Sequence, residues 1–254
     1  MTTLHCEVTG TGRDLVLLHP VGLDHTFWQS LATAAARTHR VIAIDLRGHG
    51  RSPPADKGTS LDDYVDDIHA TIAQHCKAAA SVLGLSFGGM LAQMLALRHA
   101  EDVAGLVLCG CTGGFADEVR PVLRERGLAA ERDGMEAIVA ATIERWFTPA
   151  FRADPAVERV RQRLRTDDVV SWSAAWHAMS TFHALPRLGE IAVPTLVIAG
   201  ELDAATPVAG ATRLAESIRG ARLRVLASAP HMMQIERADD HTAAVMQFLG
   251  GAHG

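Results

Sequence analysis

The chain has 254 residues, of which 48% are hydrophobic and 21% charged, and its formal net charge is −5. This composition is ordinary for a globular protein, and the length fits one α/β domain that carries an insertion. Without a basic block the sequence predicts no nucleic-acid partner. No apolar run approaches the ~18–20 residues of a membrane helix, so no membrane partner is expected either.

The N-terminal residues have neither the basic start nor the apolar core of a signal peptide. The chain has four cysteines that form no Cys-x-x-Cys pair and show no zinc-binding spacing: Cys6, Cys76, Cys109 and Cys111. We therefore expect reduced thiols, a cytoplasmic protein and no metal site. The sequence leaves the oligomeric state open between a monomer and a homodimer.

The first half of the chain alternates strand and helix patterns. Residues 4–8 alternate weakly and predict an edge strand, whereas residues 14–18, 40–45, 79–83 and 103–109 are the continuous apolar runs of strands buried on both faces. Helices are expected over residues 27–36 and 90–97, and another from Ser60, with Asp63 completing a capping box, to about residue 75. This order predicts an α/β fold with a mostly parallel sheet and helices on both faces.

The pattern changes between residues 113 and 188, where no strand is expected. Helical periodicity over residues 135–146, 157–164 and 169–182 predicts a helical cap at 113–188, inserted into a core domain made of residues 1–112 and 189–254. Three of the four tryptophans lie here. They form either the small core of the cap itself or, for one or two of them, part of a ligand site.

The sheet pattern resumes after the cap. Strands are expected at 194–200 and 222–226, with helices at 208–218 and 238–249.

A Gly-x-Ser-x-Gly pattern occupies residues 84–88, between an expected strand and an expected helix. In this context the serine sits on a sharp turn that raises its oxygen above the sheet, which predicts Ser86 as a nucleophile. The Phe87 N–H begins the helix and is free to bind an anion. The pattern alone also occurs in ordinary loops, so the flanking strand and helix carry the prediction.

Residues 19–22, His-Pro-Val-Gly, follow the strand at 14–18. Pro20 has no N–H, so the Val21 N–H is the expected second donor to an oxyanion. His19 is either a base or a structural histidine that holds this loop, and we favour the structural role.

Ser86, Asp203 and His231 each follow an expected strand, so all three can meet at one edge of the sheet. A serine needs a base to take its proton, and an imidazole needs a carboxylate to fix its tautomer. The order Ser, Asp, His along the chain is the order of α/β-hydrolases. Glu201 is the competing acid.

Five motifs in order resemble the α/β-hydrolase family over essentially the whole chain: His-Pro-Val-Gly at 19–22, Asp-Leu-Arg-Gly-His-Gly-Arg-Ser at 45–52, Gly-Leu-Ser-Phe-Gly-Gly at 84–89, Gly-Glu-Leu-Asp at 200–203 and Pro-His-Met at 230–232. The resemblance implies an α/β-hydrolase sheet with the cap inserted before the acid-bearing strand. It also favours Asp203 over Glu201, because Asp203 matches the acid loop.

Within that family, residues 134–148, 193–200 and 235–239 are similar to 3-oxoadipate enol-lactonases, which hydrolyse a small carboxylate-bearing lactone in aromatic-acid breakdown. The chain differs from them at His-Pro-Val-Gly, at Met232-Met233 and in the aromatic stretch 171–177. All three differences fall where a substrate would lie.

The resemblance implies a serine esterase or lactonase that forms an acyl-enzyme on Ser86 and needs no cofactor. The substrate-binding residues that we expect are Trp146, Trp176, Met232 and Arg145, the last for a substrate carboxylate or as a solvated charge. The alternatives are carbon–carbon bond hydrolysis or perhydrolysis on the same triad, and a non-catalytic ligand-binding protein. Haloalkane dehalogenation is excluded because it needs an aspartate at the elbow.

Overall fold

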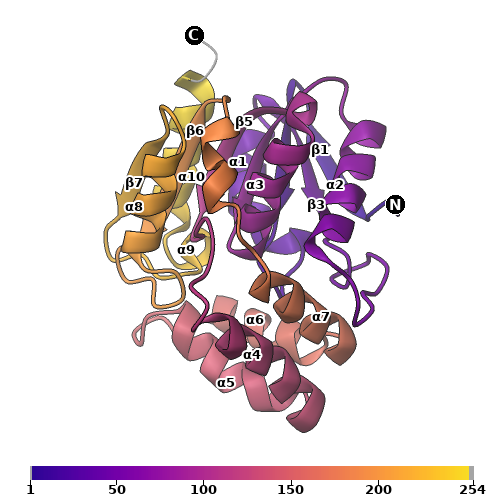
Figure 1. Ribbon diagram of the computed structural model, residues 1–254. Coiled ribbons are helices and arrows are strands. Elements are labelled where there is room, and N and C mark those ends of the chain that lie inside the picture. The colour runs from indigo at the N-terminus through magenta and orange to yellow at the C-terminus, as the bar shows by residue number, and fades with distance from the viewer. Residues whose placement is uncertain (1, 252–254) are drawn as a thin grey trace.

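A seven-stranded sheet forms the centre of the computed structural model, which describes residues 2–251 (Figure 1). The strand order is β1-β3-β2-β4-β5-β6-β7; β1 is antiparallel to β3, and all other pairs are parallel. The predicted fold class is confirmed. The strands are β1 (Cys6–Gly10), β2 (Arg13–Leu18), β3 (His39–Ile44), β4 (Ala80–Leu85), β5 (Val103–Cys109), β6 (Thr195–Gly200) and β7 (Arg222–Leu226).

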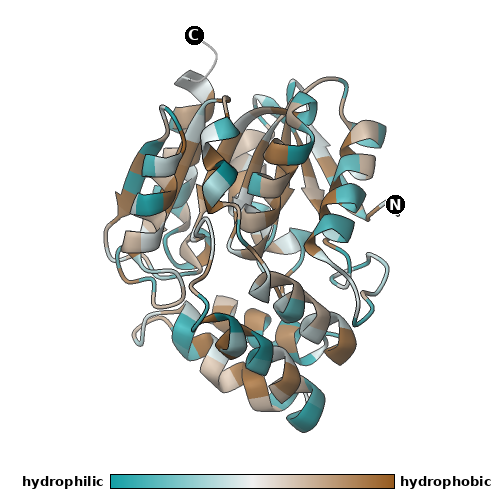
Figure 2. Cartoon of the chain, viewed as in Figure 1, coloured by the Kyte–Doolittle hydropathy of each residue, from teal (hydrophilic) through white to brown (hydrophobic). Residues whose placement is uncertain are grey.

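The central strands are buried on both faces. Every residue of β4 and β6 is buried, as expected for parallel strands that helices cover from both sides. Figure 2 shows the strands as mostly hydrophobic and the helices as mixed. Two pairs of covering helices contact each other, α1 with α10 and α2 with α3. The covering helices are α1 (Gln29–Ala35), α2 (Leu61–His75), α3 (Phe87–Arg98), α8 (Val208–Ser217) and α10 (Ala238–Gly251).

Four helices inserted between β5 and β6 form a separate layer below the sheet in Figure 1. The chain enters and leaves this insert at neighbouring points, because the N–H groups of Ala184 and Leu185 both donate to the Gly113 carbonyl, at 2.9 and 2.8 Å. The expected helix at 135–146 is confirmed. The helices are α4 (Arg120–Asp133), α5 (Met135–Trp146), α6 (Pro155–Arg165) and α7 (Val169–Ser180).

Several boundaries differ from the sequence expectation. The edge strand covers Cys6–Gly10 rather than residues 4–8, and α4 was not expected at all. The helix expected from residue 27 begins as a 3-10 turn. The capping box of α2 is confirmed, since Ser60 Oγ accepts the Asp63 N–H at 3.2 Å and Asp63 Oδ2 accepts the Ser60 N–H at 2.8 Å. The remaining short helices are η1 (His25–Trp28), η2 (Ala100–Asp102), η3 (Leu185–Glu190) and α9 (Met233–Glu236).

Among residues 2–251, no helix combines the length and the apolar character needed to cross a membrane. The four cysteines carry free thiols.

Candidate active site

Ser86 occupies a strained turn between β4 and α3. Its φ of 54° and ψ of −113° are unusual for a residue with a side chain. The two flanking glycines make the turn possible: a Cβ on Gly84 would lie 2.2 Å from the Gly88 carbonyl oxygen, and one on Gly88 would lie 2.1 Å from the Leu18 carbonyl oxygen. The Gly-x-Ser-x-Gly spacing therefore reflects backbone that approaches too closely for any larger residue.

His231 and Asp203 form a buried pair at the ends of β7 and β6. The His231 Nδ1 lies 2.8 Å from Asp203 Oδ2, and the two residues are 2% and 5% exposed. Because a carboxylate only accepts, Nδ1 carries the proton and Nε2 holds the lone pair. This is the tautomer that a general base needs.

The end of β5 brings the serine and this pair to one place. The Ser86 N–H donates to the Cys109 carbonyl at 2.9 Å. At the next residue, Gly110, a Cβ would lie 3.3 Å from His231 Nδ1 and 3.4 Å from Asp203 Oδ2. Within residues 2–251, Ser86 Oγ makes no hydrogen bond, so the nucleophile and the base share the sheet edge without being bonded.

The Asp203 carboxylate is held by more than the histidine. Its Oδ1 accepts the N–H groups of Ala205 and Thr206, both at 2.8 Å, and its Oδ2 accepts the Thr206 hydroxyl at 2.7 Å. Burial acts to raise the pKa of Asp203, but His231 and the Thr206 donors outweigh it, and the pKa lies below its ordinary value. The carboxylate is therefore ionised at neutral pH. The sequence analysis did not find Thr206.

Glu201 does not take part in this arrangement. Its side chain is exposed, and Glu201 Oε2 accepts the Ser228 N–H at 2.8 Å. Of the two candidate acids, only Asp203 contacts the imidazole.

Both expected oxyanion donors are backbone groups at the same sheet edge. Phe87 is the first residue of α3, so its N–H has no intrahelical acceptor. Its ring packs edge-on against Tyr64, at 5.0 Å between centroids. The Val21 N–H makes no hydrogen bond within the described residues 2–251.

His19 holds the Val21 loop in place. Its Nδ1 donates to the Pro20 carbonyl at 2.8 Å, and its Nε2 accepts the Leu46 N–H at 2.9 Å. Complete burial, with the nearby His49, lowers the pKa of His19 to about 3. With both nitrogens engaged, this side chain is a loop support, in line with the favoured interpretation.

Two of the expected substrate-binding residues lie beside the base. The Trp146 ring centroid is 6.3 Å from that of His231, and the Met232 N–H donates to the Trp146 carbonyl at 3.1 Å. Trp146 and Met232 are both buried. The cap helix α5 thus reaches the catalytic edge directly through its last residue.

Trp176 packs against the ring of Trp172 in the cap. Its centroid is 5.7 Å from that of Trp172, whose Cζ3 would lie 2.6 Å from a Cβ on Gly22. Gly22 directly follows the Val21 oxyanion donor. The two tryptophans therefore pack in series from Gly22 into the cap.

Arg126, which the sequence analysis did not find, lies over the second of these rings. Its guanidinium carbon is 4.8 Å above the Trp176 ring, and Arg126 and Arg145 line one hollow between α4 and α5. Burial, followed by the charge of Arg145, lowers the pKa of Arg126 to about 10, and burial also lowers that of Arg145. Within residues 2–251, neither guanidinium forms an ion pair or donates a hydrogen bond, and Glu125, the carboxylate that lines the same hollow, pairs with Arg132 instead.

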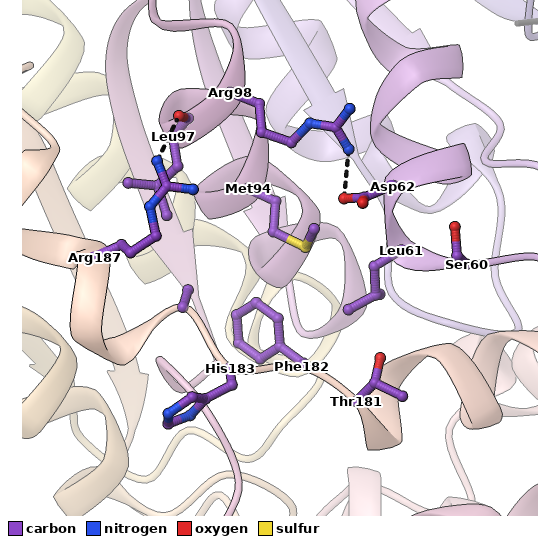
Figure 3. Close-up of a pocket in the computed structure, with 11 residues that line it drawn as sticks. Ser60, Leu61, Asp62, Met94, Leu97, Arg98, Thr181, Phe182, His183 and Arg187 are labelled. Atoms are coloured by element: carbon purple, nitrogen blue, oxygen red, sulfur yellow. Dashed lines mark hydrogen bonds and ion pairs between the residues drawn. The ribbon is translucent and has the colours of Figure 1, made fainter.

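A separate pocket lies away from these residues, between the start of α2, the end of α3 and the segment leaving the insert (Figure 3). Met94 and Phe182 form its apolar floor. An Arg98–Asp62 ion pair and an Arg187 hydrogen bond to the Leu97 carbonyl, at 3.3 Å, cross its rim. Ser86, Asp203 and His231 do not line it.

The model for the alpha/beta hydrolase family matches residues 15–245 of this chain. The chain belongs to that family. It is similar to 3-oxoadipate enol-lactonase 1 of Acinetobacter baylyi, at 26% identity over 93% of this chain and 89% of that protein. It is also similar to a pimeloyl-acyl-carrier-protein methyl ester esterase of Aeromonas hydrophila, at 28% identity over 96% of this chain and 98% of that protein.

Among solved structures, that of the enol-lactonase from Burkholderia xenovorans LB400 matches with a TM-score of 0.92 and 31% identity, covering 97% of this chain and 96% of that one. The match includes the inserted helices, since it extends over nearly the whole chain. A hydrolase of this fold is therefore established, while the similar proteins named here act on different esters and lactones.

Proposed function

We propose that the protein hydrolyses a small ester or lactone through an acyl-enzyme on Ser86. The observation that carries the proposal is the buried His231–Asp203 pair, 2.8 Å apart, beside a serine held at φ 54° by two glycines that cannot be larger. A strained nucleophile elbow beside an oriented imidazole is the arrangement that activates a serine at neutral pH.

In the proposed reaction, His231 Nε2 takes the proton from Ser86 Oγ as the oxygen attacks the substrate carbonyl. Asp203 stabilises the imidazolium that forms. The N–H groups of Val21 and Phe87 donate to the developing oxyanion, and removal of one such donor typically raises the barrier by ~3–4 kcal/mol. His231 then gives its proton to the leaving alkoxide.

In the second half of the reaction, the deacylation, His231 plays the same part with water as the nucleophile. His231 removes a proton from a water molecule, which attacks the acyl carbonyl on Ser86, and the protonated imidazole returns the proton to Ser86 Oγ as the acid product leaves. The chemistry uses only groups of this chain, and no cofactor takes part in the proposal.

For the substrate, we propose a small molecule that carries a carboxylate in addition to the scissile ester or lactone. The support is the pair of partly buried guanidinium groups of Arg126 and Arg145, which form no ion pair within residues 2–251 and of which Arg126 lies over the Trp176 ring. Carboxylates are the natural partners of such groups. The similar proteins named enol-lactonase favour 3-oxoadipate enol-lactone as the first substrate to try.

The test is a panel of p-nitrophenyl esters and small lactones, the enol-lactone included, with the wild type and Ser86→Ala. Turnover of the enol-lactone that Ser86→Ala abolishes supports the full proposal. Turnover of neutral esters alone keeps the mechanism and overturns the carboxylate-bearing substrate. If the folded wild type turns over no ester and no lactone, the proposed function is wrong, and carbon–carbon substrates come next.

A further inference from the structure

Three potential metal ligands gather at the N-terminal edge of the sheet, on chain segments that the proposed reaction does not use. They are His5, Glu7 and His25, and one ligand atom from each lies within 4.8 Å of the others. His5 directly precedes β1 and lies two residues from Glu7 in that strand, so in extended chain their side chains share a face, while Cys6 points to the other face. The strand pairing reaches His5, because its carbonyl accepts the Asp45 N–H at 2.9 Å.

A buried carboxylate orients the ring of His25. The His25 Nδ1 lies 2.7 Å from Asp45 Oδ1, and Asp45 also accepts the backbone N–H groups of His25 and Arg51, at 2.8 and 2.9 Å. The carboxylate therefore holds the proton of His25 on Nδ1 and directs the Nε2 lone pair away from it. Proteins commonly orient metal-binding histidines in this way.

The spacing of the two imidazole rings matches that of two histidine ligands of one tetrahedral ion. Their centroids are 5.3 Å apart and their planes meet at 65°. Two imidazoles bound at Zn–N distances of about 2.0–2.1 Å in a tetrahedral site have their centroids roughly 5 Å apart. Within residues 2–251, His5 Nε2 is buried without a hydrogen-bond partner, although buried polar atoms are normally satisfied.

A second cluster in the same protein lacks this geometry. His69, His99 and Asp102 also approach within 4.8 Å, but the two rings stack at 3.9 Å with planes only 11° apart. Lone pairs lie in the ring plane, so those of parallel rings do not converge on one ion. His69 Nδ1 is moreover 2.6 Å from Asp102 Oδ2, so two of the three candidate ligands of this cluster bind each other. This cluster is a matched negative control.

We propose that His5, Glu7 and His25 form a binding site for a divalent transition metal ion of the Zn²⁺ type, with solvent in the remaining position. Imidazole and carboxylate are ligands that Zn²⁺ accepts. The ion would join the edge strand to the segment that follows the oxyanion loop, since residues 19–24 directly precede His25. Its effect is on stability, and the proposed hydrolysis does not depend on it.

The experiment uses the metal-free full-length protein titrated with Zn²⁺ alone, followed by calorimetry and by thermal unfolding, with Co²⁺ as an absorbing probe of ligand geometry. We expect one ion per chain, a rise in Tm with Zn²⁺, and the visible absorption of a tetrahedral nitrogen and oxygen site with Co²⁺. Mg²⁺ prefers oxygen ligands and is expected to leave Tm unchanged.

His5→Gln is the decisive variant. Because His5 Nε2 has no hydrogen-bond partner, replacing it breaks no hydrogen bond of the metal-free protein at that atom. The variant is expected to weaken Zn²⁺ binding by at least tenfold and to remove the rise in Tm; Glu7→Gln is expected to weaken binding as well. The double variant His69→Gln/His99→Gln and the variant Cys6→Ser should bind as the wild type does. Saturable binding that survives His5→Gln, binding lost in either control, or a wild type that does not bind Zn²⁺ would each overturn the proposal.

Discussion

The Thr206 hydroxyl donates to Asp203 Oδ2 at 2.7 Å, the same oxygen that receives the proton of His231 Nδ1. The Thr206 N–H donates to the other carboxylate oxygen at 2.8 Å, so one residue binds both sides of the acid. A carboxylate held in this way cannot rotate away from the imidazole. The acid of the proposed triad is thus oriented by a neighbour three residues later in the chain.

Thr206→Val tests this orienting role, since it removes the hydroxyl and keeps the shape. A hydrogen bond to a charged group typically contributes ~1.5–3 kcal/mol, so we expect kcat to fall roughly 10- to 100-fold with KM little changed. Ester hydrolysis measured over substrate concentration separates the two constants. Thr212→Val is the control, because the Thr212 hydroxyl only donates to the Val208 carbonyl within α8. An equal loss in both variants would contradict the assignment.

Asp203→Asn tests the acid itself. The amide presents a donor where His231 Nδ1 needs an acceptor, which favours the wrong tautomer, and we expect kcat to fall about 10⁴-fold, the order seen for such replacements in serine hydrolases. Glu201→Gln is the matched control because it changes the other carboxylate of the same loop. Rates should be measured under single-turnover conditions. If Glu201→Gln proves as damaging as Asp203→Asn, the two acids have been assigned the wrong way round.

The motifs that could be recognised in the sequence are those in which backbone geometry restricts residue type. Gly84 and Gly88 stand where a Cβ would meet a carbonyl oxygen at 2.2 and 2.1 Å, and this restriction makes the elbow visible as a pattern. The buried parallel strands were equally visible, since burial on both faces leaves continuous apolar runs. Asp203 and His231 follow such strands, so topology alone predicts that they meet.

Features that depend on small or polar residues were missed. Helix α4 buries only Leu123, Gly127 and Ala130, and a Cβ on Gly127 would lie 3.0 Å from the Ser173 carbonyl oxygen of α7. Close helix packing through glycine and alanine leaves no hydrophobic stripe to detect. Thr206 and Arg126 were missed for another reason, because their roles come from contacts that only the folded chain creates.

His241 makes the stability of the protein depend on pH. Complete burial lowers its pKa from 6.5 to about 4, so between these values the unfolded chain binds a proton that the folded chain does not. The free energy of unfolding therefore falls as pH decreases through this window, by up to about 1.4 kcal/mol per pH unit for this group. His241→Leu should remove that share of the slope. Denaturant unfolding at several pH values between 4 and 7 measures it.

The control for this prediction is His183→Gln, which removes a histidine whose side chain is exposed. For each variant, the slope of the unfolding free energy against pH is compared with the slope for the wild type. The other buried groups contribute equally to the wild type and to both variants. A His241→Leu slope that matches the wild type would show that the buried imidazole is not the source of the dependence.

Arg126 and Arg145 provide the sharpest test of substrate class, since neither guanidinium forms an ion pair within residues 2–251. If a substrate carboxylate binds them, Arg145→Gln should lower kcat/KM for carboxylate-bearing lactones by roughly 10- to 100-fold, the value of one charge-assisted hydrogen bond of ~1.5–3 kcal/mol. Neutral p-nitrophenyl esters should be hydrolysed at nearly the wild-type rate. Arg126→Gln should act in the same direction, with a further loss of stability because its guanidinium packs on Trp176.

Arg165→Gln supplies the control within the cap, since Arg165 is exposed and pairs with Glu136 and Glu158, and none of these residues lines the hollow. The informative quantity is the ratio of kcat/KM for the charged and the neutral substrate in each variant. A ratio that falls in Arg145→Gln and Arg126→Gln, but not in Arg165→Gln, assigns carboxylate recognition to the hollow between α4 and α5. A parallel fall for both substrates would instead mean that the two arginines stabilise the cap, and that the carboxylate, if the substrate has one, binds elsewhere.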